Sequence, residues 1–243
     1  MKIKTSTITF WFNKQNDIKQ YSEKFNKALE SHFFPFNVFG IPATVDLLYP
    51  RMTTVSRSNH SNIEFSLINL RLNTIFDSNY ESDLDSCINY LKDRALLIYR
   101  TLNDCGIDIV YSAIFMALDE KCDSPEKSII KKFFNNGDYK NVNEVGIRLS
   151  NTIDDKYYKI LNINNNKSVK FKKIVDSNTS KEIVLPLLSL DEAEEIEDYL
   201  MTSVEVNDKL IYNRDHKHVT NETDFVEMLE HIKKEIANEL ERF

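Results

Sequence analysis

The chain has 243 residues, of which 42% are hydrophobic and 28% are charged, and its formal net charge is −7 at pH 7. A chain of this length is one large domain or two small ones, and it can bury a substantial core. The negative charge argues against wholesale coating of nucleic acid, although it does not exclude a local basic patch. Four glycines leave almost no material for a glycine-rich phosphate-binding loop.

The cysteines and the N-terminus indicate the cellular compartment. Cys87, Cys105 and Cys122 are an odd number without CxxC spacing, which is typical of free thiols in a reducing environment. The N-terminal residues lack the apolar core of a signal peptide, and no run approaches the ~20 apolar residues of a membrane-spanning helix. We therefore expect a cytoplasmic protein that does not insert into a membrane.

The first half of the chain predicts an α+β unit, because alternating apolar segments are separated by segments with helical spacing. The predicted elements are, in order, a strand at 5–12, a helix at 16–33, a strand at 43–49 that can continue to 55, a strand at 63–72, a helix at 82–105 and a strand at 107–118. A slip in the alternation near Leu67 predicts a β-bulge. Strand, helix, strand, strand, helix, strand is the ferredoxin-like βαββαβ order.

The stretch from Ile107 to Leu118 is the strand around which this unit is organised. It contains one charge in twelve positions and lies between Gly106 and Asp119. A short apolar run between turn signals is typical of a strand buried on both faces in the middle of a sheet. We expect burial of Ile109, Tyr111, Ala113 and Phe115 on one face and of Val110, Ile114 and Met116 on the other.

The second half predicts a mixed α+β unit. Its predicted elements are a helix beginning at Ser124, a three-stranded meander over 142–175 with turns at Asp154-Asp155 and at 164–166, a helix opened by a capping box at Ser189, a strand at 204–212 and a long C-terminal helix at 224–242. The fold class is therefore α+β, with a ferredoxin-like half at 1–120 and a second half at 121–243. We expect the two halves to pack as one compact unit.

The segment 156–173 is rich in lysine and aromatic residues and contains no acidic residue. Lysines on one face of a sheet can contact a phosphate backbone while nearby aromatic rings stack on bases. The candidate nucleic-acid-binding residues are Tyr157, Lys159, Lys167, Lys170, Lys172 and Lys173. The alternative is a solvated sheet face whose edge lysines prevent aggregation, with the acidic stretch 191–198 as a source of neutralising charge.

His216 and His218 offer two imidazoles in a short segment, and this spacing on a strand would point both rings the same way. A metal site needs three or four convergent ligands, and no further ligand is evident nearby in the sequence. A solvated loop is the competing interpretation. No serine lies in a G-x-S-x-G motif, and we identify no catalytic residue and no cofactor site.

One stretch resembles a known family. Residues 145–153 read V-G-I-R-L-S-N-T-I, which is similar to the V-G-x-R-x-x-N-x-I signature of a sporadically distributed bacterial family of unknown function. Leu149 stands where that family has Tyr, and Thr152 stands where it has Arg. The resemblance implies a bacterial accessory protein, from a mobile-element or phage-defence locus, and it brings no catalytic residues with it.

Two functions follow from these observations. The first is a non-enzymatic interaction protein that binds another protein, because no cluster of catalytic or ligand-binding residues stands out. The alternative is a nucleic-acid-binding or RNA-processing protein that uses the basic sheet face at 156–173.

Overall fold

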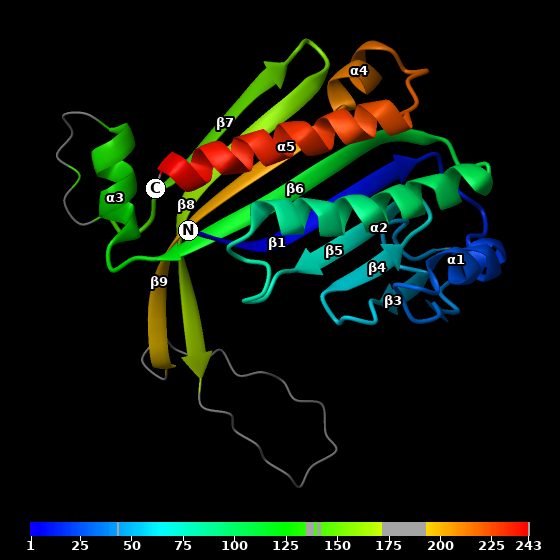
Figure 1. Ribbon diagram of the computed structural model, residues 1–243, viewed down its shortest axis with the longest axis horizontal. Helices are drawn as coiled ribbons and strands as arrows, with labels where there is room; N and C mark the ends of the chain where they lie inside the picture. The colour runs from blue at the N-terminus through cyan, green and yellow to red at the C-terminus, as the bar shows by residue number, and fades with distance from the viewer. Residues whose placement is uncertain (43, 135–138, 140–141, 172–192, 243) are drawn as a thin grey trace, which may run out of the picture.

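The computed structural model describes residues 1–42, 44–134, 139, 142–171 and 193–242 (Figure 1). It is a mixed α+β protein, and in this part of the chain nine strands form one antiparallel sheet in the order β2-β3-β4-β5-β1-β6-β9-β8-β7. The sheet carries helices against one of its faces (Figure 1). None of the described helices is both long and apolar enough to cross a membrane.

The first half contains five strands before its long helix. The elements are β1 (Lys2–Phe12), the short 3-10 helix η1 (Lys19–Tyr21), α1 (Ser22–Leu29), β2 (Asn37–Val38), β3 (Met52–Val55), β4 (Ser61–Phe65), β5 (Asn69–Ile75), α2 (Leu84–Asp104) and β6 (Ile109–Lys121). The strand predicted at 43–49 is wrong over its described residues 44–49, which are not a strand, and only its possible continuation to 55 contains one, β3.

The predicted ferredoxin-like half is not confirmed. The segment predicted as one bulged strand at 63–72 is instead a hairpin of β4 and β5, so the phase slip near Leu67 marks a reversal of the chain. Ser66 holds the turn, because its Oγ accepts from the Asn69 backbone N–H at 3.0 Å and donates to Asn69 Oδ1 at 2.8 Å. The reversal places an additional strand between β3 and β5.

The second half forms α3 (Pro125–Phe133), β7 (Gly146–Ile153), β8 (Tyr157–Phe171), β9 (Ala193–Asn207), α4 (Lys209–Arg214) and α5 (Glu222–Arg242). The turn at Asp154-Asp155 is confirmed, and both residues have positive φ angles. The turn predicted at 164–166 is wrong, because β8 continues through these residues, paired with β9 throughout and with β7 as far as Asn164. The third strand of the meander is β9.

The helix predicted from Ser189 to Leu200 is wrong over its described part, which is strand β9. Residues 189–192 lie outside the described residues. The helical spacing of Ala193, Ile196 and Leu200 suggested a helix, but alternate residues from Leu200 to Val206 are buried and pair with β6 and β8. Long-range pairing therefore overrides the local pattern. The strand predicted at 204–212 ends at Asn207, where α4 follows.

The core lies between the sheet and the helices, and it draws on both halves of the chain. Phe10 of β1 contacts the Phe225 ring of α5 at 5.3 Å and the Tyr99 ring of α2 at 6.3 Å between centroids. Buried side chains of β1, β6, β9, α2 and α5 belong to one cluster. A smaller cluster places Ile129 of α3 against Ile163 and Leu200 on the same side of the sheet.

Strand β6 lies in the middle of the sheet, between β1 and β9, as predicted. Ile114 and Met116 are fully buried beneath the helices as predicted, whereas Val110, predicted on the same face, is only partly buried. The other face was also predicted to be buried, but Tyr111, Ala113 and Phe115 are partly exposed. Ile109, predicted on that face, is fully buried, because a register shift after Trp11 pairs it with the buried Phe12. The helices α1, α2, α3 and α5 pack on the first face alone, so β6 does not have the two covers that its apolar sequence suggested. We call the second face the open face.

Candidate functional site

The described lysines of the predicted nucleic-acid site are matched by acidic residues. Lys159 Nζ lies 2.9 Å from Glu235 Oε2 of α5, and both side chains are mostly buried. Lys167 Nζ lies 3.6 Å from Asp198 Oδ1 of β9. Lys170 is in β8 at the register position opposite Glu195, while Lys172 and Lys173 lie outside the described residues. Ion pairs with acids leave these cations less available to a phosphate backbone.

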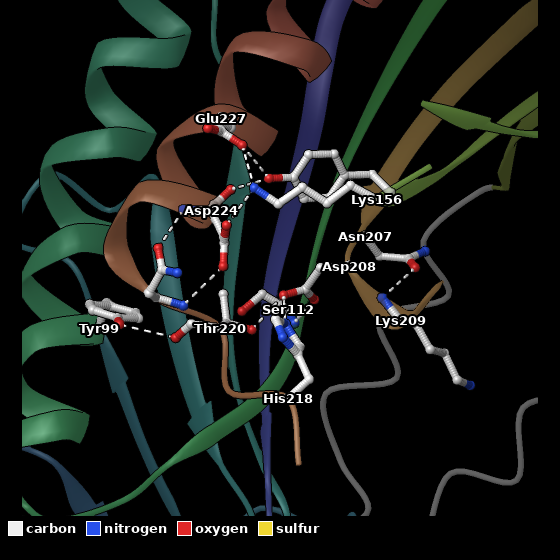
Figure 2. Close-up of polar contacts among 12 residues, drawn as sticks. Tyr99, Ser112, Lys156, Asn207, Asp208, Lys209, His218, Thr220, Asp224 and Glu227 are labelled. Carbon is white, nitrogen blue, oxygen red and sulfur yellow. Dashed lines mark hydrogen bonds and ion pairs between the residues drawn. The ribbon is translucent and has the colours of Figure 1, made fainter. Parts of the chain in front are cut away.

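Tyr157 is 1% exposed, so its ring has no free face for stacking on a base. Its hydroxyl donates to Glu227 Oε2 at 2.6 Å, and Lys156 Nζ lies 2.6 Å from Asp224 Oδ1 and 2.7 Å from Glu227 Oε2 (Figure 2). Burial alone lowers the pKa of Lys156, but its hydrogen bonds to Asp224 and Glu227 raise that pKa overall. This group fastens the start of β8 to the first turns of α5.

The two histidines of the predicted metal site have different surroundings. His216 is exposed, with its ring 6.0 Å from the Tyr212 ring of α4. His218 points inward, and its Nε2 lies 2.9 Å from Asp208 Oδ2 (Figure 2). Within the described parts of the chain, no three His, Cys, Asp or Glu side chains are grouped so that they could hold a metal ion.

Asp208, at the end of β9, is the centre of a buried polar cluster (Figure 2). Its side chain is 0% exposed. Oδ1 accepts from the Ser112 backbone N–H at 2.7 Å, and Oδ2 accepts from Thr220 Oγ1 at 2.6 Å in addition to its contact with His218. The Thr220 carbonyl in turn accepts from the Tyr99 hydroxyl at 3.0 Å. Both carboxylate oxygens have hydrogen-bond partners within the protein. The cluster therefore joins β6, α2 and the segment before α5 and has a structural role.

The open face carries a hollow that sequence reasoning did not identify. Its volume is about 420 Å³, and its walls come from β1, β5, β6, β9 and the loop before β3. The lining residues are Thr7, Thr9, Trp11, Leu48, Asn69, Arg71, Ala113, Phe115 and Glu205. Cross-strand pairing brings them together, since Thr7 lies opposite Phe115 and Thr9 lies opposite Ala113. The strands therefore fix the backbone positions from which these side chains project.

Aromatic rings extend from one end of this hollow. The Trp11 and Tyr111 rings stack with centroids 5.5 Å apart and an interplanar angle of 19°. The Tyr212 ring of α4 also packs against Tyr111, with the two centroids 5.4 Å apart. Lys209 Nζ lies 5.6 Å from the Tyr111 centroid. Burial is the main cause that raises the pKa of Tyr111 to about 12, so this hydroxyl stays neutral at physiological pH.

The described lining of the hollow has two charged groups, of opposite sign, which are Arg71 and Glu205. Arg71 Nη2 lies 2.9 Å from Glu64 Oε2, while the Arg71 Nε atom is buried and has no hydrogen-bond acceptor among the described residues. On the β9 side, Glu205 Oε1 accepts from Asn207 Nδ2 at 2.7 Å. The Arg71 side chain as a whole is 38% exposed and lines the hollow, so its guanidinium is a donor that a ligand can reach.

A larger hollow of about 550 Å³ lies beside the β2–β3 end of the sheet, lined by Phe39, Ile41, Val45, Tyr49, Pro50 and Thr53. It is mostly apolar and has no charged side chain in its lining. The hollow on the open face combines apolar walls with convergent polar groups, which is the usual composition of a binding site. We therefore take the open-face hollow as the candidate site.

The alternation of Thr7, Thr9 and Trp11 in the sequence marks the side of β1 that faces away from the core. It does not tell which other strands lie next to β1, and the site exists only once β5, β6 and β9 are in register. No protein-family model matches this chain, and no curated protein matches it either, so the site is defined by its geometry alone.

Proposed function

We propose that the protein is a non-enzymatic interaction protein that binds another protein through its open face. The observation that carries this proposal is the hollow of about 420 Å³ in which Trp11, Phe115 and Arg71 converge from three neighbouring strands. Tryptophan and arginine are the residue types most enriched at the energetic centres of protein interfaces.

The charge of the open face favours a protein over a nucleic acid. Interface cores are enriched in aromatic residues and arginine and depleted of lysine and acids. Arg71 is the one cation in the lining of the hollow, and Glu205 is the one acid. A nucleic-acid site needs several cations that neutralise phosphates, because counterion release supplies most of the affinity. Among the described residues that line the hollow, Arg71 alone supplies such a charge.

The contacts of the hollow suggest what a partner presents. An apolar or aromatic side chain fits against Ala113 between Trp11 and Phe115, and a carbonyl or carboxylate oxygen beside it accepts from the exposed part of the Arg71 guanidinium. Because the strands hold these groups in place before binding, little conformational entropy is lost when the partner docks. The broader role, as an accessory protein of a bacterial mobile-element or phage-defence locus, rests on the resemblance at 145–153.

The test is an affinity comparison. The protein captures its partner from an extract of the source organism, and the purified partner is titrated against wild type, Phe115→Ala and Arg71→Ala. We expect each variant to weaken the Kd about 30-fold, which corresponds to a hot-spot loss of ~2 kcal/mol. Phe34→Ala is the matched control, because Phe34 is exposed and lies outside the hollow.

Two results would overturn the proposal. One is an unchanged Kd for both hollow variants when their melting temperatures equal that of wild type. The other is tight binding of labelled single-stranded RNA at about 150 mM salt that Lys159→Ala and Lys167→Ala abolish, because this would assign the protein to the nucleic-acid class.

A further inference from the structure

The two edges of the sheet are built differently. At one edge, β2 pairs over only two residues, and Pro35 precedes it in the segment that follows α1. Short edge strands and proline are standard protections against pairing with another chain. At the other edge, β7 pairs with β8 over eight residues, from Gly146 to Ile153, without a register shift. This edge is long and regular.

Strand β7 also has few of the residues that protect an edge. It contains no proline and no lysine, and Arg148 is its one charged residue. Leu149, near its middle, is 53% exposed. Among the described strands, none lies beyond β7. A regular edge strand with an exposed leucine, whose outer backbone groups pair with no other described strand, is a template for another strand.

We propose that β7 pairs antiparallel with β7 of a second copy of this chain, about a two-fold axis at Leu149, so that one sheet runs through both copies. This interface is distinct from the open face, and it does not depend on the function proposed above. A two-fold interface uses the same surface on both subunits, which an antiparallel strand pair satisfies directly.

The sequence of β7 selects the register. Backbone groups of successive residues point to opposite sides of a strand, so two residues that face each other in an antiparallel pair of identical strands differ in number by zero or an even count. The residue midway between them therefore lies on the two-fold axis, opposite its own copy. Arg148 opposite itself would set like charges against each other, which is destabilising. Ser150 opposite itself would place the exposed Leu149 opposite the polar Asn151, so the leucine would gain no apolar partner.

Leu149 opposite its copy buries the exposed leucine in an apolar cross-strand pair. In the same register Arg148 faces Ser150 and Ile147 faces Asn151, so no like charges meet within the strand. The pairing spans Gly146 to Thr152, which is nearly the whole of β7.

Sedimentation equilibrium gives the first test. We expect wild type to be a dimer at about 100 μM, where a complex with a Kd of ~1 μM is mostly associated. Leu149→Lys should be a monomer, because it places two like charges opposite each other at the axis. Ile75→Lys is the matched control, since Ile75 is 68% exposed on an inner strand and should leave the dimer intact. A monomeric wild type, or a dimeric Leu149→Lys variant, would refute the proposal.

Cysteine cross-linking gives the second test and fixes the axis. Directly opposed residues have Cβ atoms ~4.5–5.5 Å apart, close enough for Leu149→Cys to form a disulfide-linked dimer on mild oxidation. Asn151→Cys should not cross-link, because its copy is four residues further along the strand, at about 13 Å. Wild type controls for Cys105 and Cys122, while burial raises the pKa of Cys87 to about 12 and keeps that thiol unreactive. Cross-linking of Asn151→Cys in place of Leu149→Cys would contradict the axis.

Discussion

At the scale of single residues, the Asp208 carboxylate is a fully buried acidic group. A buried charge is tolerated only when hydrogen bonds replace its hydration. Asp208 obtains them from Ser112, Thr220 and His218, which come from two distant segments of the chain. His218 therefore serves the fold, and its neighbour His216 stays at the surface.

Replacing Asp208 should destabilise the protein strongly. Asp208→Ala leaves the Ser112 N–H, the Thr220 hydroxyl and the His218 ring nitrogen without their acceptor, so we expect a loss of about 3 kcal/mol in the free energy of unfolding. Urea unfolding monitored by circular dichroism measures this loss. Glu230→Ala, at an exposed site on α5, should change stability by less than about 0.5 kcal/mol. A loss below about 1 kcal/mol for Asp208→Ala would show that the hydrogen bonds of this cluster contribute little to the stability of the fold.

At the scale of elements, the start of β1 is fastened to the turn that precedes α2. Glu81 in that turn is 8% exposed and accepts hydrogen bonds from both Lys2 and Lys4 of β1. The Ile3 backbone N–H also donates to the Glu81 carbonyl at 2.9 Å. The hydrogen bond from Lys2, followed by that from Lys4, lowers the pKa of the Glu81 carboxyl.

This attachment predicts a dependence of stability on acid pH. Because the pKa of Glu81 is lower in the folded than in the unfolded protein, its contribution is complete above the unfolded value of about 4.3 and is lost as the pH falls through the folded value. Wild type should melt at a higher temperature than Glu81→Gln at pH 7, and the difference should disappear as the pH falls towards about 3.

Thermal melts of wild type and Glu81→Gln at a series of pH values measure this difference. Glu30→Gln is the control, because Glu30 is exposed and its variant should follow the wild-type curve. A difference between wild type and Glu81→Gln that stays constant across the pH range would rule out the ion pairs as its cause.

At the scale of the whole molecule, the boundary at residue 120 does not divide the sheet. Strand β6 of the first half pairs with β9 of the second over nine register positions, from Ala113 to Lys121. The Phe225 ring of α5 packs on Phe10 and Tyr99 of the first half. Shared strands and a shared core couple the stability of the two halves.

This coupling predicts a single unfolding transition. Trp11, the one tryptophan of the chain, reports on the first half, whereas Phe225 belongs to the second. Phe225→Ala should lower the free energy of unfolding by about 3–5 kcal/mol, because it leaves a cavity in the common core. The shift should be the same in Trp11 fluorescence and in far-ultraviolet circular dichroism. A Trp11 transition that does not move would establish two independent domains.

The sequence by itself determined the elements whose information is local. The long helices α2 and α5 follow from apolar residues at helical spacing, and the turn at Asp154-Asp155 follows from two residues that tolerate positive φ. The central position of β6 also followed from its apolar run. Neighbours within a few positions suffice for the helices and the turn, and the composition of a single strand suffices for β6.

Only the tertiary structure decided the features that depend on pairing between distant segments. Residues 193–200 have a helical pattern but form a strand, because β6 and β8 supply hydrogen-bond partners on both sides. The hairpin of β4 and β5, the acids that neutralise Lys159 and Lys167, and the hollow on the open face likewise require strand order and register. A strand's alternation shows that it has two faces, but which neighbours complete each face depends on contacts between residues far apart in the chain.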